Sequence, residues 1–255
     1  MPSCYAHYRF GQQAVPSVPE NIRRVIEKQR RLFDLGLQGP DFFFYYRPWM
    51  DTPVRKLGHG FHYQTGREFF GRVCRELEQP TEGELAYLYG LLGHYCLDAV
   101  CHPRIHELAR KDALLHNRLE SEFDRYLMER DGISRPHFRN RGRFLPCGIR
   151  NCRVAARFYP GASYRQIREA LWSMRLVLGL LMVHPGAKRV LRWMGGANPG
   201  LLMENCPDPV GRSANGQLLR LYEEALGQYP VCLEQLEEHR TSGKPFGKEL
   251  EGIFG

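Results

Sequence analysis

The stretch GLLGHYCLDAVCHPRIHE, from Gly90 to Glu107, places polar side chains where packing residues are expected. His94, Asp98 and His102 follow one another at intervals of four residues, so on an α-helix they share one face. The apolar residues around them indicate burial, and an unpaired buried carboxylate is costly. A bound cation removes that cost. The stretch therefore predicts a buried helix that carries a row of metal ligands.

Apolar residues recur with the helical period along most of the chain, and no segment alternates convincingly as a strand would. Helices are predicted over residues 20–34, 54–79, 81–101 or beyond, 115–131, 163–183, 188–194 and 215–239. Thr81 with Glu84, and Ser163 with Gln166, mark two of the starts as capping boxes. Pro103 is expected to stop or kink the third helix. The fold class expected is all-α.

Composition bounds the class of protein. The chain has 255 residues, of which 43% are hydrophobic and 25% charged, which is ordinary for a globular protein with a sizeable core. Its net charge of +8 suggests phosphates, nucleic acid or an acidic membrane surface as partners, although a solvated arginine-rich surface gives the same value. No secretory signal is visible, and the longest apolar run, 176–183, is too short for a transmembrane segment, so a cytoplasmic location is expected.

A second helix repeats the ligand spacing. His116 and Glu120 lie one turn apart, with Asp124 one turn further on. Two antiparallel helices with such faces can direct several nitrogen and oxygen ligands into one space. Imidazole and carboxylate together suit zinc, and also iron or manganese. The Glu-x-x-His, His-Asp and His-Glu-x-x-His patterns of other metal enzymes are absent.

Several blocks carry a family resemblance. MPSCYAHYRFG, LFDLGLQGPDFFFYY, LGHGFHYQ, GHYCLDAVCHP and HNRLESEFDRYLMERDG, in this order, resemble the zinc-dependent phospholipase C family and most closely its cytoplasmic bacterial members. The single-strand-specific zinc nucleases are related to it. The resemblance implies one all-α multi-helix bundle over residues 1–255. Residues 1–132 would form the half with the metal site, and residues 133–255 a basic loop and helices that complete the bundle.

The resemblance also implies a site for up to three zinc ions. One zinc would be held by Asp41, His62, His94 and Asp98. A second would be held by His102, His116 and Glu120. A third would be held by His7, by Asp98 as a bridge, and by the first residue, which is Pro2 after removal of Met1, or else Met1 itself. Asp41 is in addition the candidate general base.

Some positions keep two interpretations. His59 and His62 compete for one ligand place, and His62 fits the family block better. Cys4 lies three residues before His7 and could serve as a substitute metal ligand, although a core cysteine is the simpler interpretation. The aromatic run from Asp41 to Trp49 is either a wall for choline or acyl groups or part of the packed core.

The function expected is hydrolysis of a phosphodiester, lipid or soluble, by metal-activated water. Transient contact with an anionic membrane surface is expected, and nucleic acid is a less favoured partner. The arginine-rich residues 134–160 could contact polyanions or form a solvated loop. The alternatives are a phosphodiesterase like the single-strand nucleases, and a non-catalytic zinc-binding module on the same scaffold.

Overall fold

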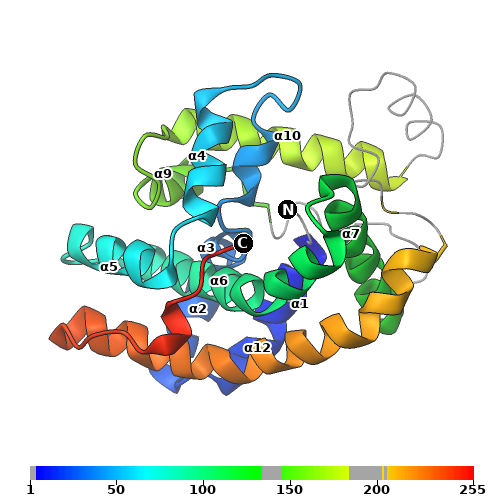
Figure 1. Ribbon diagram of the computed structural model, residues 1–255. Helices are drawn as coiled ribbons and strands as arrows, with labels where there is room; N and C mark the ends of the chain where they lie inside the picture. The colour runs from blue at the N-terminus through cyan, green and yellow to red at the C-terminus, as the bar shows by residue number, and fades with distance from the viewer. Residues whose placement is uncertain (1–3, 134–144, 184–202, 204–205) are drawn as a thin grey trace.

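Figure 1 shows a computed structural model of the chain, in which the structure of residues 4–133, 145–183, 203 and 206–255 is described. The described part consists of helices and loops, with no strand beyond one isolated bridge between Thr65 and Ile253. The expected all-α fold is therefore confirmed. The helices are α1 (Cys4–Ala14), α2 (Glu20–Lys28), α3 (Arg30–Gly36), α4 (Pro53–His62), α5 (Gly66–Glu76), α6 (Glu82–Ala109), α7 (Ala113–Arg130), α9 (Ile149–Ala156), α10 (Tyr164–Val183) and α12 (Pro209–Ser242), with short 3-10 turns η1 (Val15–Ser17), η2 (Asp41–Tyr45) and η4 (Lys248–Leu250).

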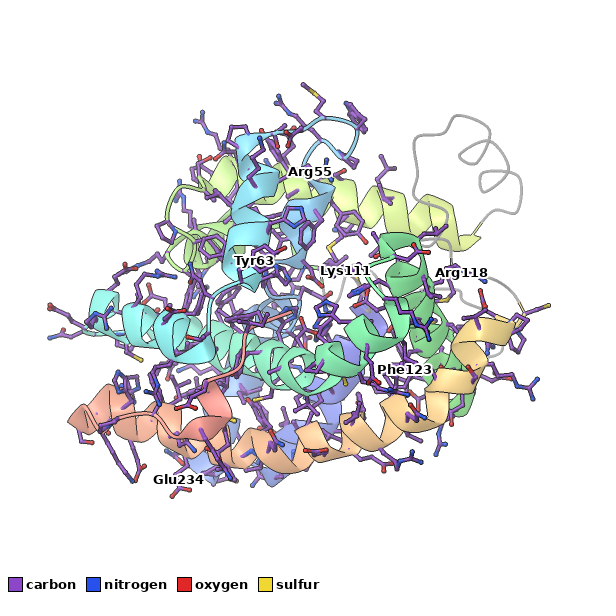
Figure 2. The ribbon with its side chains drawn as sticks, in the orientation of Figure 1. Arg55, Tyr63, Lys111, Arg118, Phe123 and Glu234 are labelled. Atoms are coloured by element: carbon purple, nitrogen blue, oxygen red, sulfur yellow. The ribbon has the colours of Figure 1, made fainter. Side chains whose placement is uncertain are left out.

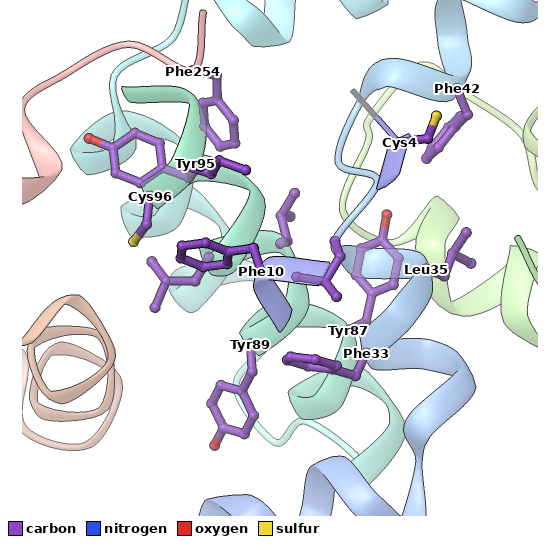
Figure 3. Close-up of a cluster of buried hydrophobic side chains, with 14 of the residues drawn as sticks. Cys4, Phe10, Phe33, Leu35, Phe42, Tyr87, Tyr89, Tyr95, Cys96 and Phe254 are labelled. Atoms are coloured by element: carbon purple, nitrogen blue, oxygen red, sulfur yellow. The ribbon is translucent and has the colours of Figure 1, made fainter. Parts of the chain in front are cut away.

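Helix α6 is the central element of the bundle. Helix α12 runs along one side of α6 and α7, and α4, α9 and α10 lie on the other side (Figure 1). Figure 3 shows part of the core that these helices bury, with Phe10, Phe33 and Tyr87 among its aromatic rings. No helix among the described residues is both long enough and apolar enough to cross a membrane.

The start of α6 follows the predicted capping box, and its end lies beyond the predicted stop. The Thr81 N–H donates to Glu84 Oε2 at 2.8 Å, and the Glu84 N–H donates to Thr81 Oγ1 at 3.3 Å. The helix then continues through Pro103 to Ala109, although proline removes one backbone donor and crowds the preceding turn. His102 therefore remains on the same helix as His94.

Two predicted helices are each divided in the structure. The helix expected over residues 20–34 breaks at Gln29, which separates α2 from α3. The helix expected over residues 54–79 breaks between His62 and Gly66, because Thr65 forms a second capping box with Glu68 and starts α5. After each break, the two shorter helices can point in different directions. A single continuous helix, as predicted, could not.

The second half of the chain differs from the prediction in smaller ways. Within the irregular stretch expected over 134–160, residues 149–156 form helix α9. Helix α10 begins with the predicted Ser163–Gln166 capping box, in which the Ser163 N–H donates to Gln166 Oε1 at 2.8 Å. Helix α12 is longer than the predicted 215–239. The helix predicted over 188–194 lies outside the described residues.

Helices α3 and α6 are in direct backbone contact through two glycines. A Cβ atom added to Gly90 would lie 2.1 Å from the Phe33 carbonyl oxygen, and one added to Gly36 would lie 2.2 Å from the Tyr87 carbonyl oxygen. Any side chain at either position must push the two backbones apart. The loop that follows α3 contributes Asp41, so this contact sets how close that loop comes to the histidines of α6.

We expect Gly90→Ala to lower the free energy of unfolding by about 1–3 kcal/mol or more, because the added methyl group overpacks a backbone contact. Gly227→Ala in α12 is the matched control. A Cβ at Gly227 meets nothing within 4 Å, so the helix should be stabilised by about 0.5–1 kcal/mol. Urea unfolding of both variants measures the difference, and equal stability of the two would contradict the glycine contact.

Candidate metal centre

The polar row of α6 is buried, and its members face one another. His94, Asp98 and His102 have exposed fractions of 0%, 5% and 5%. His94 Nε2 lies 3.1 Å from Asp98 Oδ2, and His102 Nδ1 lies 3.5 Å from Asp98 Oδ1. The helical spacing thus places one carboxylate between two imidazoles. Because Asp98 presents both of its oxygens to histidines, it is well placed to bridge two metal ions.

Three other elements bring further ligands to this row. Helix α1 places His7 Nε2 3.2 Å from Asp98 Oδ1 and stacks the His7 ring on the His94 ring with centroids 4.2 Å apart. The turn η2 begins with Asp41, and α4 ends with His62. His62 Nε2 lies 3.0 Å from Asp41 Oδ1, and both side chains are buried.

Helix α7 supplies the far end of the site. His116 Nε2 lies 3.3 Å from Glu120 Oε1, and His102 Nε2 lies 3.1 Å from the same oxygen. Glu120 therefore joins the ligands of α7 to the row on α6, as the repeated four-residue spacing suggested. On both helices, successive candidate ligands lie one turn apart on a single face.

The candidate ligands form three clusters, of which two share His94. In each cluster, one ligand atom from every residue lies within 4.8 Å of the others. The clusters are His7 with Asp41 and His94, His62 with His94 and Asp98, and His102 with His116 and Glu120. All the side chains proposed from the sequence are thus brought together, except for Met1 and Pro2, which lie outside the described residues. The third cluster has the same members as the set that the resemblance implied for one zinc.

Hydrogen bonds fix the orientation of two of the imidazoles. His62 Nδ1 lies 2.7 Å from the Gly58 carbonyl oxygen, and His94 Nδ1 lies 3.2 Å from the Leu37 carbonyl oxygen. Each ring therefore donates its Nδ1 proton to the backbone and turns its Nε2 toward the carboxylates. Metal-binding histidines are held in this way, because a fixed tautomer keeps the ligating lone pair directed at the ion.

Several buried ring nitrogens are poorly satisfied. Within the described part of the chain, His7 Nδ1 has no hydrogen-bond partner, and His94 Nε2 and His102 Nδ1 have only the Asp98 carboxylate nearby, at 3.1 and 3.5 Å. A buried polar atom without a partner costs free energy, and a metal ion is the partner that imidazole nitrogens and carboxylates share. The donor set therefore fits zinc.

The charges of the cluster are strongly coupled. Burial raises the pKa of Asp98, but His102, His94 and His7 outweigh burial and hold it well below its usual range. Burial lowers the pKa of His94 and of His102, but the Asp98 carboxylate outweighs burial and raises both. Burial also opposes the ionisation of Asp41, yet its surroundings, including the hydrogen bond from His62, lower its pKa to about 2. The carboxylates are therefore ionised at neutral pH.

Glycine at position 39 makes room for the cluster. Its φ of +51° is in the left-handed region, and a Cβ there would lie 2.2 Å from Cδ2 of the His94 ring. The end of the described chain also returns to the site, since the Gly255 N–H donates to the His62 carbonyl oxygen at 3.2 Å. Phe254 is fully buried beside His94. Neither contact has a signal in the sequence, because both join segments far apart along the chain.

Asp124 is a buried capping residue, although the sequence suggested only a continuation of the α7 face. Its two oxygens accept the N–H groups of Tyr5 and Ala6 at 3.0 and 2.8 Å. Asp124 therefore holds the first turn of α1, which carries His7. Cys4 lies in the hydrophobic core, where burial raises the pKa of its thiol well above the usual value, as expected for a packing cysteine.

The two histidines that competed for one place have different positions. His62 is buried with Asp41, whereas His59 is exposed and packs its ring against Phe44 at 4.8 Å. The aromatic run is mostly core, since Phe42, Phe43 and Tyr45 are buried. His59 thus lies beside the cluster, in the opening that leads to it.

A cleft of about 960 Å³ opens onto the ligands. Its lining includes His62, His102 and His116, and this volume is typical of sites for small molecules. Figure 2 shows Arg55, Tyr63 and Lys111, three further lining residues, on the elements that surround the opening. A substrate in the cleft can therefore reach the cluster directly from solvent.

Comparison with protein families gives a match over residues 6–159 to the model described as zinc dependent phospholipase C. The chain belongs to the zinc-dependent phospholipase C family. The match covers more than half of the chain and extends beyond the blocks recognised up to Gly132. Neither the curated proteins nor the solved structures include a match to this chain. Membership makes the protein a candidate metal-dependent hydrolase, in agreement with the His, Asp and Glu clusters.

We expect Asp98→Asn to lower the zinc content by more than one ion per chain, because Asp98 contacts three imidazoles from two clusters. His59→Ala is the matched control and should leave the zinc content unchanged. Elemental analysis of protein purified without chelators measures both. Equal losses in the two variants would mean that His59 is a ligand and that the choice of His62 is wrong.

Zinc affinity should rise with pH above about pH 6.5, the ordinary pKa of imidazole. In the metal-free protein, the pKa values of His94 and His102 are raised, so these rings keep their protons to a higher pH than a free imidazole does. Zinc requires neutral imidazoles, so binding displaces those protons and strengthens as the pH rises through the raised pKa values. The change is about tenfold per pH unit for each proton displaced. Titration against a competing chelator at several pH values measures the slope, and a flat profile would contradict it.

Proposed function

We propose that this protein hydrolyses phosphodiesters in the manner of a phospholipase C, with up to three zinc ions as cofactors. The observation that carries the proposal is the convergence of imidazoles and carboxylates from α1, η2, α4, α6 and α7 at the base of an open cleft. Zinc bound by these residues would polarise the phosphoryl oxygens, lower the pKa of a water molecule and offset charge on the departing alkoxide.

We assign the ligands by element. His62, His94, Asp98 and Asp41 would hold one ion, and His102, His116 and Glu120 a second. His7 and Asp98 would hold the third, together with the amine and carbonyl of the first residue. The close approach of His7 to Asp98 supports the bridging role of Asp98, since one of its oxygens faces His7 and the other faces His94.

Asp41 is the proposed general base. It is buried at the ligand cluster and ionised above about pH 2, so it can accept a proton from the attacking water at any physiological pH. The new bond forms between the water oxygen and phosphorus, and the bond from phosphorus to the alcohol oxygen breaks. A carboxylate of low pKa holds the proton only briefly and passes it to the departing alkoxide. The products are an alcohol and a phosphomonoester.

The contacts of the cleft favour this reaction over the nuclease alternative. Proteins that bind single strands stack successive bases on aromatic faces. The described lining of the cleft includes two aromatic side chains, Phe44 and Tyr63, and the Phe44 ring already packs against His59 and His62. Tyr63 is the other Tyr, Phe or Trp of the described lining, and the further rings are histidines, most of them at the metal cluster, which does not suit a run of bases.

Zinc-loaded protein should cleave the soluble diester bis(4-nitrophenyl) phosphate, and Asp41→Asn should lower kcat by about 10²–10⁴-fold. Asp51→Asn is the matched control, because Asp51 is exposed and pairs only with Lys56 among its described neighbours. Elemental analysis of the same samples separates loss of the base from loss of a ligand. Full zinc content without turnover of this diester would instead identify a non-catalytic zinc-binding module. Cleavage of single-stranded DNA in preference to lipid diesters would identify a nuclease.

A further inference from the structure

Two cations, Arg55 and Lys111, line the cleft beside the candidate metal centre, and neither forms an ion pair with a described residue. Arg55 donates to the Met50 carbonyl oxygen at 3.0 Å, and its Nε is buried without a partner in the described part of the chain. Its guanidinium therefore keeps unused donors.

The acidic side chains of the same cleft are already engaged. Glu107 pairs with Arg104 at 2.5 Å. Asp112 caps α7 by accepting the N–H groups of Leu114 and Leu115 at 2.8 and 3.2 Å. Glu107 is therefore paired with a cation of its own helix, and Asp112 is turned toward the backbone of α7, which leaves Arg55 and Lys111 as lining cations without an ion pair in the described structure. These two cations can attract an anion in addition to the phosphodiester that the zinc ions would hold.

The backbone at Lys111 is held in an unfavourable conformation. Arg110 has φ +47° and Lys111 has φ +69°, so two successive residues other than glycine occupy the left-handed region. Glycine would adopt this turn without strain. Arg110 is the left-handed cap that ends α6, which is common at helix ends, whereas the second left-handed residue, Lys111, is unusual, and such strain clusters at functional sites. Here it is the side chain of Lys111 that the turn presents to the cleft.

The position of Arg55 on α4 also sets its spacing from the candidate ligand His62. Arg55, His59 and His62 lie on one face of α4, because they are spaced by four and three residues. Seven residues of helix separate Arg55 from the ligand His62, which corresponds to about 10 Å along the axis. This axial separation of the two backbones leaves room for about one sugar or cyclitol ring between a group bound by Arg55 and a phosphate at the metal centre.

The same cleft lacks the features that bind choline. Quaternary ammonium groups are held against several aromatic faces, and cations in the wall repel them. Phe44 is covered by two histidine rings, at 4.8 and 5.1 Å, and Tyr63 is the other aromatic side chain of the described lining. A zwitterionic choline head group would therefore meet two cations and one open ring.

We propose that Arg55 and Lys111 bind an anionic head group, so that the substrate is a phosphodiester that bears a second negative group, such as a phosphomonoester, about one ring away from the scissile phosphate. The inference deepens the proposed function and rests on it. A lipid head group and a soluble sugar-phosphate diester share this chemistry.

The first experiment compares two products as ligands of the zinc-loaded protein by calorimetry. Inositol 1,4-bisphosphate and phosphocholine both offer one phosphomonoester to the metal centre, but only the first carries a second anion. Wild-type protein should bind the bisphosphate at least tenfold more tightly. In Arg55→Gln/Lys111→Gln this ratio should fall at least fivefold, whereas Arg55→Lys should keep most of it. Equal binding of the two ligands by wild-type protein overturns the proposal.

The second experiment measures kcat/KM for phosphatidylinositol 4-phosphate and phosphatidylcholine in mixed micelles, and for the corresponding soluble glycerophosphodiesters. The ratio between the inositol phosphate and choline substrates should exceed ten and should fall at least tenfold in the double variant, mainly through KM. Lys56→Gln/Arg110→Gln, which changes the neighbouring exposed cations outside the cleft, should keep the ratio. Preference in the lipid pair alone identifies a membrane substrate, and preference in the soluble pair a soluble one.

The two experiments separate the two proposals. Turnover with no preference for the anionic head group overturns the inference and leaves the phosphodiesterase in place. No turnover of any diester overturns the proposed function, and the calorimetric ratio then still decides whether Arg55 and Lys111 bind an anion. If the double variant fails to fold, the single variant Lys111→Gln is used, because Lys111 is exposed and its side chain forms no described hydrogen bond.

Discussion

The carboxylate of Asp98 is buried among three imidazoles, and the rest of the site is arranged around it. His7, His94 and His102 each approach within 3.5 Å of one of its oxygens. The carboxylate can accept from all three rings, but His7 Nδ1, on the other side of its ring, is buried without a partner in the described structure. Bound cations would satisfy such nitrogens and the carboxylates together. The need for them follows from burial, since the same groups in water would be solvated separately.

The register of α6 could be predicted from the sequence, whereas the contacts around it could not. The four-residue spacing of His94 and Asp98 and the capping box at Thr81 are local signals, and both describe the structure correctly. His102 joins the row only because the helix continues through Pro103, which local rules leave open. The missed break before α5 had a local signal as well, since Thr65 and Glu68 repeat the capping-box pattern.

The remaining parts of the site depend on contacts between distant segments. The Leu37 carbonyl oxygen orients His94 across 57 positions of sequence, and Asp124 caps α1 across more than a hundred. Gly39 could be recognised as a turn residue, but that its missing side chain makes room for the His94 ring emerges only from packing. Arg55 and Lys111 do not stand out among 36 lysines and arginines, because their acidic neighbours and the cleft between them are visible only in three dimensions.

Helices α4 and α6 each connect the candidate metal ligands to one of the two cations of the cleft. Helix α4 carries the candidate ligand His62 and, two turns earlier on the same face, Arg55. Helix α6 carries the ligand His102 and ends at the strained turn that presents Lys111. Because each helix is rigid over these few turns, the distance between the metal centre and the cationic wall is fixed by the fold. In the proposed function, a head group would therefore be selected by its length as well as by its charge, and a change at either end of α4 would alter both together.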